Sequence, residues 1–163
     1  MATATLVMDR PETEVSKIVW AGLTVAVLDA LFAIVLYVVV LHATTPARVF
    51  QSIASGLLGK ASYSGGASTV ALGVVCHLTV AFGWTLIFYV ASRRIDSIRE
   101  LLRTNAGSIA VGLAYGVFIW LAMDFVVLRV SRATPTPVAN WRFWAMLAWH
   151  AVGVGLPMVK ILR

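Results

Sequence analysis

Four ionisable side chains lie inside long apolar runs of this sequence: Asp29, His77, Asp124 and His150. An imidazole titrates near neutral pH, and a carboxylate can hold a cation or relay a proton. A single charge at the centre of a bilayer costs about 3 kcal/mol, so we expect these groups to face one another. They are the candidate polar core and the candidate path for a proton or small cation.

The runs that surround these residues predict membrane-spanning helices. The chain has 163 residues, of which 60% are hydrophobic and 12% charged, whereas a soluble domain is about 25% charged. Runs of about 20 apolar residues are long enough to cross a bilayer as helices. The sequence therefore predicts an all-α, polytopic membrane protein with four transmembrane helices. The predicted spans cover about residues 18–41, 67–91, 106–128 and 141–161.

The distribution of basic residues predicts the orientation. Residues 1–17 are predicted to form a cytoplasmic tail, and residues 18–163 a single transmembrane domain. Eight basic residues lie on the side of the two termini: Arg10, Lys17, Arg93, Arg94, Arg99, Arg103, Lys160 and Arg163. Five lie on the other side: Arg48, Lys60, Arg129, Arg132 and Arg142. Because basic residues are enriched in cytoplasmic loops, both termini are predicted to be cytoplasmic.

The segment between the first two spans predicts a further helix, at about residues 46–60. Its apolar residues recur at three- and four-residue spacing, opposite a polar face. The apolar face consists of Val49, Phe50, Ile53, Leu57 and Leu58, and the polar face of Arg48, Gln51, Ser52 and Ser55. This pattern is typical of an amphipathic interfacial helix on the membrane surface. A re-entrant segment or a lid over a cavity is the alternative.

Small residues at four-residue spacing predict where helices approach closely. Gly73 and Ala81 flank His77 at that spacing, so the imidazole lies on a small-residue face. Residues 108, 112 and 116 are Ser, Gly and Gly, a ladder that favours close packing of the third span.

The depths of the polar groups leave several uses open. At 1.5 Å rise per residue, Asp29, His77 and His150 share one level, and Asp124 lies roughly 9 Å further toward the outer side. The groups can serve as interhelical hydrogen bonds or as a proton or cation path. His77 and His150 can also be axial ligands of one b-type haem. A transition-metal site from His77, His150 and Asp29 is a further alternative.

Several function classes find no support in the sequence. The net charge is +6, but the basic residues lie at span ends, where they meet lipid headgroups, so no nucleic-acid binding is expected. Cys76 is the single cysteine, which excludes an intrachain disulfide and a cysteine metal site. No catalytic motif occurs, so we do not predict an enzyme. We expect no cofactor, with haem b as the alternative.

The order of features resembles the YagU-like bacterial inner-membrane proteins. The resemblance rests on the glycine-rich start of the third span, Asp124, the Thr134-Pro135 turn, Trp141 and the two histidine-bearing spans. Members of that family carry a histidine at the position of Asp124, so no fixed metal-ligand role follows for that residue. The resemblance implies a bacterial cytoplasmic membrane and four spans, and no established activity.

These observations favour a small transport-type protein with a polar core that is permeable to protons or a small cation. The alternatives are a structural or accessory membrane subunit without intrinsic flux, and a b-type haem-binding membrane protein. The expected partner is the lipid bilayer. The small-residue faces and the basic central loop are compatible with a homo-oligomer or a larger membrane complex.

Overall fold

The computed structural model describes residues 11–134, 136–138 and 140–163, and these residues form helices and loops without any strand. Four helical runs are long and apolar enough to cross a membrane. They cover Glu14–Val40, Gly66–Arg94, Asn105–Val130 and Trp141–Leu162. The predicted all-α architecture with four spans is thus confirmed.

The first span begins earlier than predicted. Helix α1 covers Pro11–Ile34 and continues as a π-helix, η1, over Val35–Val40. Proline suits the first turn of a helix because its missing N–H would have no partner there. Residues 11–17, predicted to belong to the tail, are therefore helical, and residues 1–10 lie outside the described part of the chain.

The third and fourth spans are also assembled from consecutive helical segments, whereas the second is one continuous helix. The second span is α3 (Gly66–Arg94), and a short helix, α4 (Asp96–Leu101), leads to the third. The third consists of α5 (Asn105–Ala122), the π-helix η3 (Met123–Val127) and α6 (Leu128–Val130). The fourth consists of α7 (Trp141–Trp149), the π-helix η4 (His150–Gly155) and α8 (Leu156–Leu162).

Polar caps fix where two of these spans start. The hydroxyl of Thr104 accepts a hydrogen bond of 3.0 Å from the Gly107 N–H and caps α5. The side chain of Asn140 accepts one of 3.0 Å from the Arg142 N–H and caps α7. Both residues are of the type that caps helices, because a short polar side chain satisfies a free N–H of the first turn.

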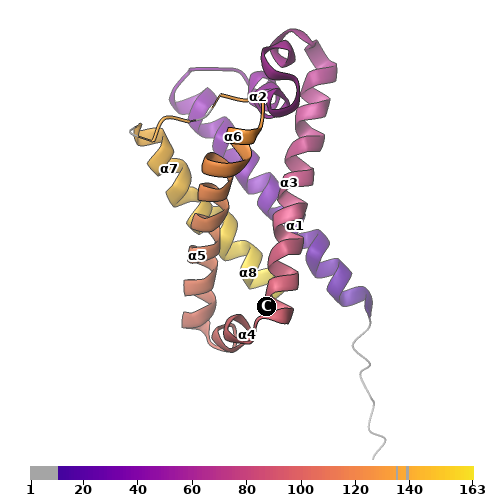
Figure 1. Cartoon of the computed structure of the whole chain (residues 1–163), viewed down its shortest axis with the longest axis vertical. Coiled ribbons are helices and arrows are strands. Elements are labelled where there is room, and N and C mark those ends of the chain that lie inside the picture. Colours follow the sequence, from indigo (N-terminus) through magenta and orange to yellow (C-terminus); the bar gives the residue numbers. More distant parts are fainter. Residues whose placement is uncertain (1–10, 135, 139) are drawn as a thin grey trace, which may run out of the picture.

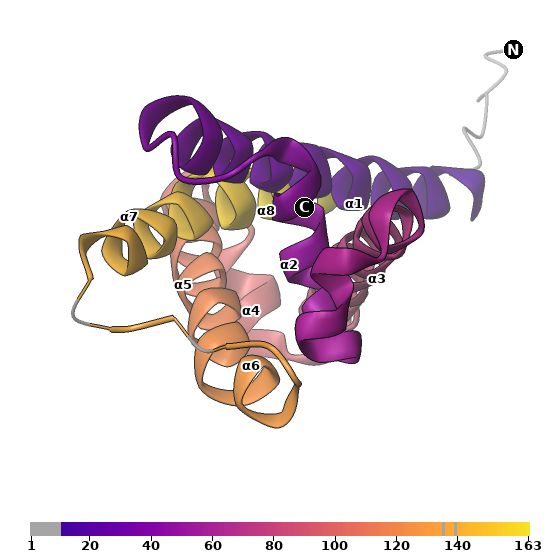
Figure 2. The same ribbon diagram turned by 90° about the horizontal axis from the view of Figure 1, so that it is seen from above.

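The bundle has two distinct ends (Figures 1 and 2). Helix α4, the start of α1 and the C-terminus lie together at one end, which we call the α4 end. Helices α2 (Pro46–Leu58) and α6 lie at the other, the α2 end. The guanidinium of Arg163 donates to the Asn105 side chain at 2.7 Å, which ties the end of the chain to the start of α5. The cytoplasmic position of this end stays a prediction.

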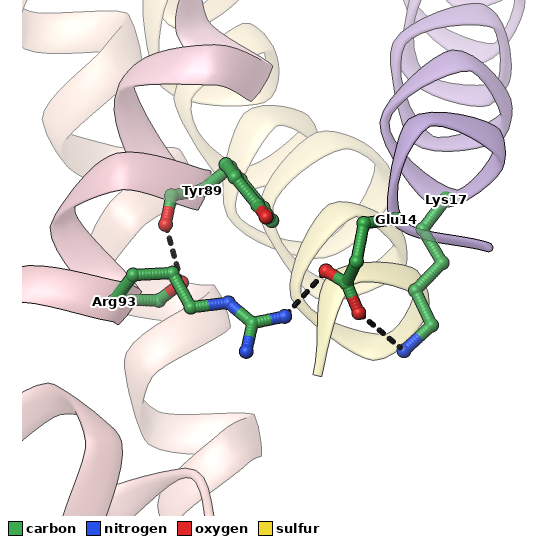
Figure 3. A network of polar contacts seen from close by, with 5 residues as sticks. Glu14, Lys17, Tyr89 and Arg93 are labelled. Carbon is green, nitrogen blue, oxygen red and sulfur yellow. Dashed lines mark hydrogen bonds and ion pairs between the residues drawn. The ribbon is translucent and has the colours of Figure 1, made fainter. Parts of the chain in front are cut away.

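An ionic contact joins α1 to α3 at the α4 end (Figure 3). The guanidinium of Arg93 pairs with the carboxylate of Glu14, and the Lys17 ammonium lies 3.7 Å from the same carboxylate. The Arg93 guanidinium also lies 5.2 Å from the centre of the Tyr89 ring. All three charged groups remain partly exposed.

Two buried clusters form the core, one in each half of the bundle. The cluster nearer the α4 end, called the apolar cluster below, consists of Ala21, Val25, Phe88, Ile119, Val154, Met158, Val159 and Leu162. The cluster nearer the α2 end consists of Leu36, Trp120, Phe143 and Met146. Burial of these side chains against each other leaves many large apolar residues on the outside of the spans, as a lipid environment requires.

Glycines bring the third and fourth spans into backbone contact. A methyl group added at Gly116 would overlap the carbonyl of His150, and one added at Gly155 would overlap the carbonyl of Gly112. Such overlaps mean that only glycine permits this separation of the helix axes. The small-residue ladder predicted on the third span is therefore confirmed as a packing surface.

The helix predicted between the first two spans is present, and part of its predicted polar face is buried. Gln51 and Ser55 of that polar face are only 6% and 5% exposed. Leu57 and Leu58 of the predicted apolar face are 58% and 40% exposed. The amide of Gln51 donates to the Thr69 hydroxyl of α3 at 3.2 Å. The reason for the burial of Gln51 is that α3 supplies a polar partner for its side chain.

Helix α2 lies across one end of the bundle. Figure 2 shows α2 between the ends of α1, α3 and α6 when the bundle is seen from above. A methyl group at Gly73 of α3 would overlap the carbonyl of Phe50, so the α2 backbone lies directly on α3. The predicted close approach at the face of Gly73 is thereby confirmed, with α2 as the partner.

Candidate functional site

All four predicted polar residues line a single cavity. Its volume is about 190 Å³, and Asp29, His77, Asp124 and His150 each contribute from a different span. The remaining lining residues are apolar, aromatic or sulfur-containing: Val25, Ile53, Val80, Ala81, Trp84, Ile119, Trp120, Met123, Leu128, Met146, Val154 and Met158. The structure therefore brings together the groups that the sequence placed at similar depths.

The cavity occupies the half of the bundle nearer the α2 end. It reaches Ile53 of α2 and Leu128 of α6 on that side. On the other side it ends at Val154 and Met158, which belong to the apolar cluster. Because Met158 is completely buried there, the apolar cluster separates the cavity from the α4 end.

The side chains of Asp29 and His150 face each other in the cavity. The Nδ1 atom of His150 lies 2.9 Å from the Met146 carbonyl. A carbonyl only accepts, so Nδ1 carries a proton and donates. The Nε2 atom then faces the Asp29 carboxylate, whose Oδ1 is 3.6 Å away.

His77 makes a different contact, to backbone. Its Nε2 atom lies 2.8 Å from the carbonyl of Ala26 and therefore donates to it. This hydrogen bond links α3 to α1 across the edge of the cavity. The Phe50 ring of α2 approaches the imidazole edge-on, with 6.4 Å between the ring centres. His77 thus combines a packing role with a position on the cavity wall.

Asp124 is the most deeply buried acidic group of the site. Only 3% of the residue is exposed, and among the described residues neither carboxylate oxygen has a hydrogen-bond partner. Thr136, Arg129 and His150 are the polar residues that act on this carboxylate, Thr136 through its side-chain hydroxyl. A buried carboxylate without direct partners is costly, and such groups in membrane spans typically mark a functional site.

π-helical segments accompany the polar residues. His150 opens η4, and Asp124 is the second residue of η3. Such wide turns are rare and often occur at functional sites, because they redirect side chains that a regular helix would aim elsewhere. The sequence holds one signal for η4: Pro157 has no N–H to donate to the carbonyl of Gly153, so the regular pattern cannot continue. The π-helix of the first span, η1, begins at Val35, on the C-terminal side of Asp29.

The two histidines are not arranged as a pair of ligands. His77 directs Nε2 to Ala26, and His150 directs Nε2 to Asp29, so ligation of one haem through these atoms would require both contacts to break. Within the described residues, no group of three or more His, Cys, Asp or Glu side chains is placed to hold a metal ion. The geometry therefore gives the haem and transition-metal alternatives no support.

Two tryptophans, Trp84 and Trp120, line the cavity, although they were not predicted to be part of the site. The ring centre of Trp120 lies 4.7 Å from that of His150. The indole N–H of Trp84 donates to the Met123 sulfur at 3.5 Å. Helical spacing was a usable signal, since Trp120 precedes Asp124 by one turn and therefore shares its face.

Comparison with known proteins places the chain in no group. No protein-family model matches it, and no curated protein and no solved structure matches it either. The resemblance to the YagU-like proteins therefore stays a prediction. The four apolar spans are those of a multi-pass, helical membrane protein, and four ionisable side chains line a cavity between its helices.

Proposed function

We propose that this protein transports protons or a small cation across a membrane through the polar cavity. One observation carries the proposal: four ionisable side chains from four spans converge on one cavity in an otherwise apolar bundle. Interhelical adhesion does not need this convergence, because hydroxyl and amide side chains serve that purpose at lower cost.

The contacts in the cavity supply the elements of a proton path. The Oδ1 atom of Asp29 lies 3.6 Å from the Nε2 atom of His150, and we propose that a proton passes between these two side chains. Asp124 lies near His150 on the third span and offers two buried oxygens as the next acceptor. Protonation of a carboxylate also removes the cost of holding its charge in the membrane.

The apolar cluster implies that transport requires a conformational change. Phe88, Met158 and Val159 are at most 1% exposed and close the bundle between the cavity and the α4 end. A continuous water-filled pore is therefore not present in this conformation. We infer that the cavity opens alternately to the two sides, with the tightly packed third and fourth spans moving as one body.

Location and orientation belong to the same proposal. We place the protein in the cytoplasmic membrane of a bacterium, with both termini in the cytoplasm. Support comes from the basic residues at the α4 end, where Arg93 and Arg163 lie with the two ends of the described chain. Basic residues favour the cytoplasmic side.

Flux into proteoliposomes tests the proposal. The unmodified protein should dissipate an imposed pH gradient faster than empty liposomes do. Asp29→Asn and Asp124→Asn should reduce this flux to the background, because an amide neither takes up a proton nor carries the negative charge that balances a cation. His77→Ala should lower the flux as well, since the imidazole forms part of the wall.

Asp96→Asn serves as the matched control, because Asp96 lies in the exposed helix α4 and pairs with Arg99. Flux that Asp29→Asn and His77→Ala leave unchanged would contradict the proposal. Absence of any flux, together with co-purification in a larger complex, would instead identify a structural or accessory subunit.

A further inference from the structure

The walls of the cavity are poorly suited to an inorganic cation. Among the lining side chains, only Asp29 and Asp124 carry oxygen atoms. A hard cation such as Ca²⁺ takes about six to eight oxygen ligands, and Mg²⁺ about six. Most backbone carbonyls of the spans are engaged in helical hydrogen bonds, so they supply few of the missing ligands. An inorganic ion would therefore lose its hydration shell without compensation.

The same walls nevertheless attract positive charge. Asp124 presents two buried oxygens and Asp29 one that have no hydrogen-bond partner within the described part of the chain. The basic groups among the lining side chains are the imidazoles of His77 and His150. No lysine or arginine lines the cavity among the described residues.

Aromatic and apolar surfaces make up the rest of the site. The indole rings of Trp84 and Trp120 line the cavity, and tryptophan is the strongest aromatic partner for a cation. The methionines at positions 123, 146 and 158 add soft, adaptable surface. The volume of about 190 Å³ far exceeds the about 15 Å³ that one water requires, so an ion with several carbon substituents has room.

We propose that the cavity binds a small organic cation of the quaternary ammonium class. Its charge would be held by Asp124 and Asp29, and its alkyl groups by the tryptophans and the apolar wall. This inference rests on the proposed transport function and names its substrate class. Entry would occur at the α2 end, where Ile53 and Leu128 border the cavity.

Calorimetric titration of the purified protein tests this inference. The protein is placed in nanodiscs of phosphatidylglycerol and phosphatidylethanolamine, because phosphatidylcholine itself carries a quaternary ammonium group. Choline and tetraethylammonium should bind saturably, at one site per chain. Potassium should not bind, and the uncharged isostere of choline, with carbon in place of nitrogen, should bind at least about tenfold more weakly.

Variants locate the binding in the cavity. Asp124→Asn should weaken choline binding about tenfold or more, and Trp120→Leu about fivefold. Asp124→Glu retains the charge and should retain most of the affinity. The controls are Asp96→Asn and Trp144→Leu, since both side chains are exposed on the outside of the bundle. Monodisperse elution confirms that each variant is folded before titration.

A separate experiment distinguishes a soluble ammonium ion from the headgroup of a lipid. Nanodiscs that contain phosphatidylcholine should leave free choline binding unchanged if the ligand is a soluble cation. Competition by this lipid would identify its headgroup as the occupant of the same site.

Lack of saturable binding by any ammonium, or equal binding by potassium, would overturn the inference. Choline binding that Asp124→Asn leaves unchanged would also overturn it. Proton flux measured on the same preparation separates the two proposals. Persistent flux without ammonium binding removes only this inference, whereas loss of both removes the proposed function as well.

Discussion

The contact between the third and fourth spans differs from the contact between the first and second. Gly116 of α5 meets the backbone of η4 directly, at the carbonyl of His150. Gly22 of α1 instead meets a side chain, the ring of Phe82 on α3, which would lie 2.7 Å from an added methyl group. Glycine thus joins two backbones in one interface and accommodates a ring in the other.

This difference explains where the cavity lies. Backbone contact between α5 and η4 leaves no room for side chains, so those two spans form a compact pair. The α1–α3 contact holds the helices apart by the width of a ring, and the polar groups occupy the space that remains beside it. Glycine therefore contributes both to the cavity and to the compact pair of helices, because it contacts a side chain in one interface and a backbone in the other.

The largest expected effect is at the backbone contact. Gly116→Ala should destabilise the folded bundle by about 3 kcal/mol, the upper end for overpacking, because two backbones would have to separate. The free energy of unfolding in mixed detergent micelles measures this effect.

Gly83→Ala is the matched control for Gly116→Ala. Gly83 lies in α3 with no atom within 4 Å of an added methyl group, so alanine should be neutral or stabilising by up to about 1 kcal/mol through helix propensity. Equal effects of the two substitutions would show that α5 and η4 do not touch in the membrane.

Much of this fold was predictable from residue patterns. Apolar length predicts the four spans, because a bilayer imposes length and polarity on any helix that crosses it. The spacing of Gly112 and Gly116 predicts a close contact, since residues four apart share a helix face. Depth alone brings Asp29 and His150 to one level, and the structure confirms that both line the same cavity.

Other features depend on tertiary contacts, which residue patterns along the sequence do not predict. Gln51, on the polar face of α2, turns inward because its amide donates a hydrogen bond to the Thr69 hydroxyl of α3. Hydropathy along the sequence does not predict this pairing. The start at Pro11 escapes prediction because a helix can extend beyond the apolar run that defines the span. Of the π-helices, only η4 has a local cause in Pro157, and apolar periodicity does not mark η3 around Asp124.

A smaller effect is expected at the hydrogen bond between α3 and α1. His77→Ala should destabilise the bundle by about 1 kcal/mol, because it removes one interhelical hydrogen bond to the Ala26 carbonyl. The same unfolding assay measures this change. Thr79→Ala is the control on the same helix, since the Thr79 hydroxyl is bonded only to the Val75 carbonyl of its own turn.

A loss of about 3 kcal/mol or more for His77→Ala would contradict the comparison. It would mean that a single bond holds the α1–α3 contact as firmly as the glycines hold α5 against η4. The compact pair would then no longer be the more rigid part of the bundle.

The smallest expected effect concerns the ionic contact at the α4 end, which also joins α1 to α3. Arg93 and Glu14 are 52% and 35% exposed at their side chains, so water and salt screen their attraction. A double-mutant cycle with Glu14→Gln and Arg93→Gln should give a coupling energy of about 0.5 kcal/mol, which decreases at high salt. Glu14→Gln alone already loses the contact with Lys17, and Arg93→Gln alone already loses the contact with the Tyr89 ring. The cycle subtracts these single-variant effects and leaves the coupling between Glu14 and Arg93.

The size of this coupling decides how the first two spans are held. A weak coupling leaves ring packing at Gly22 and the His77 bond as the main links between α1 and α3, so this interface can open while α5 and η4 remain together. A coupling well above about 1 kcal/mol that resists salt would mean a desolvated pair. The α4 end would then be clamped, and movement between α1 and α3 would have to be confined to the α2 end, beside the cavity.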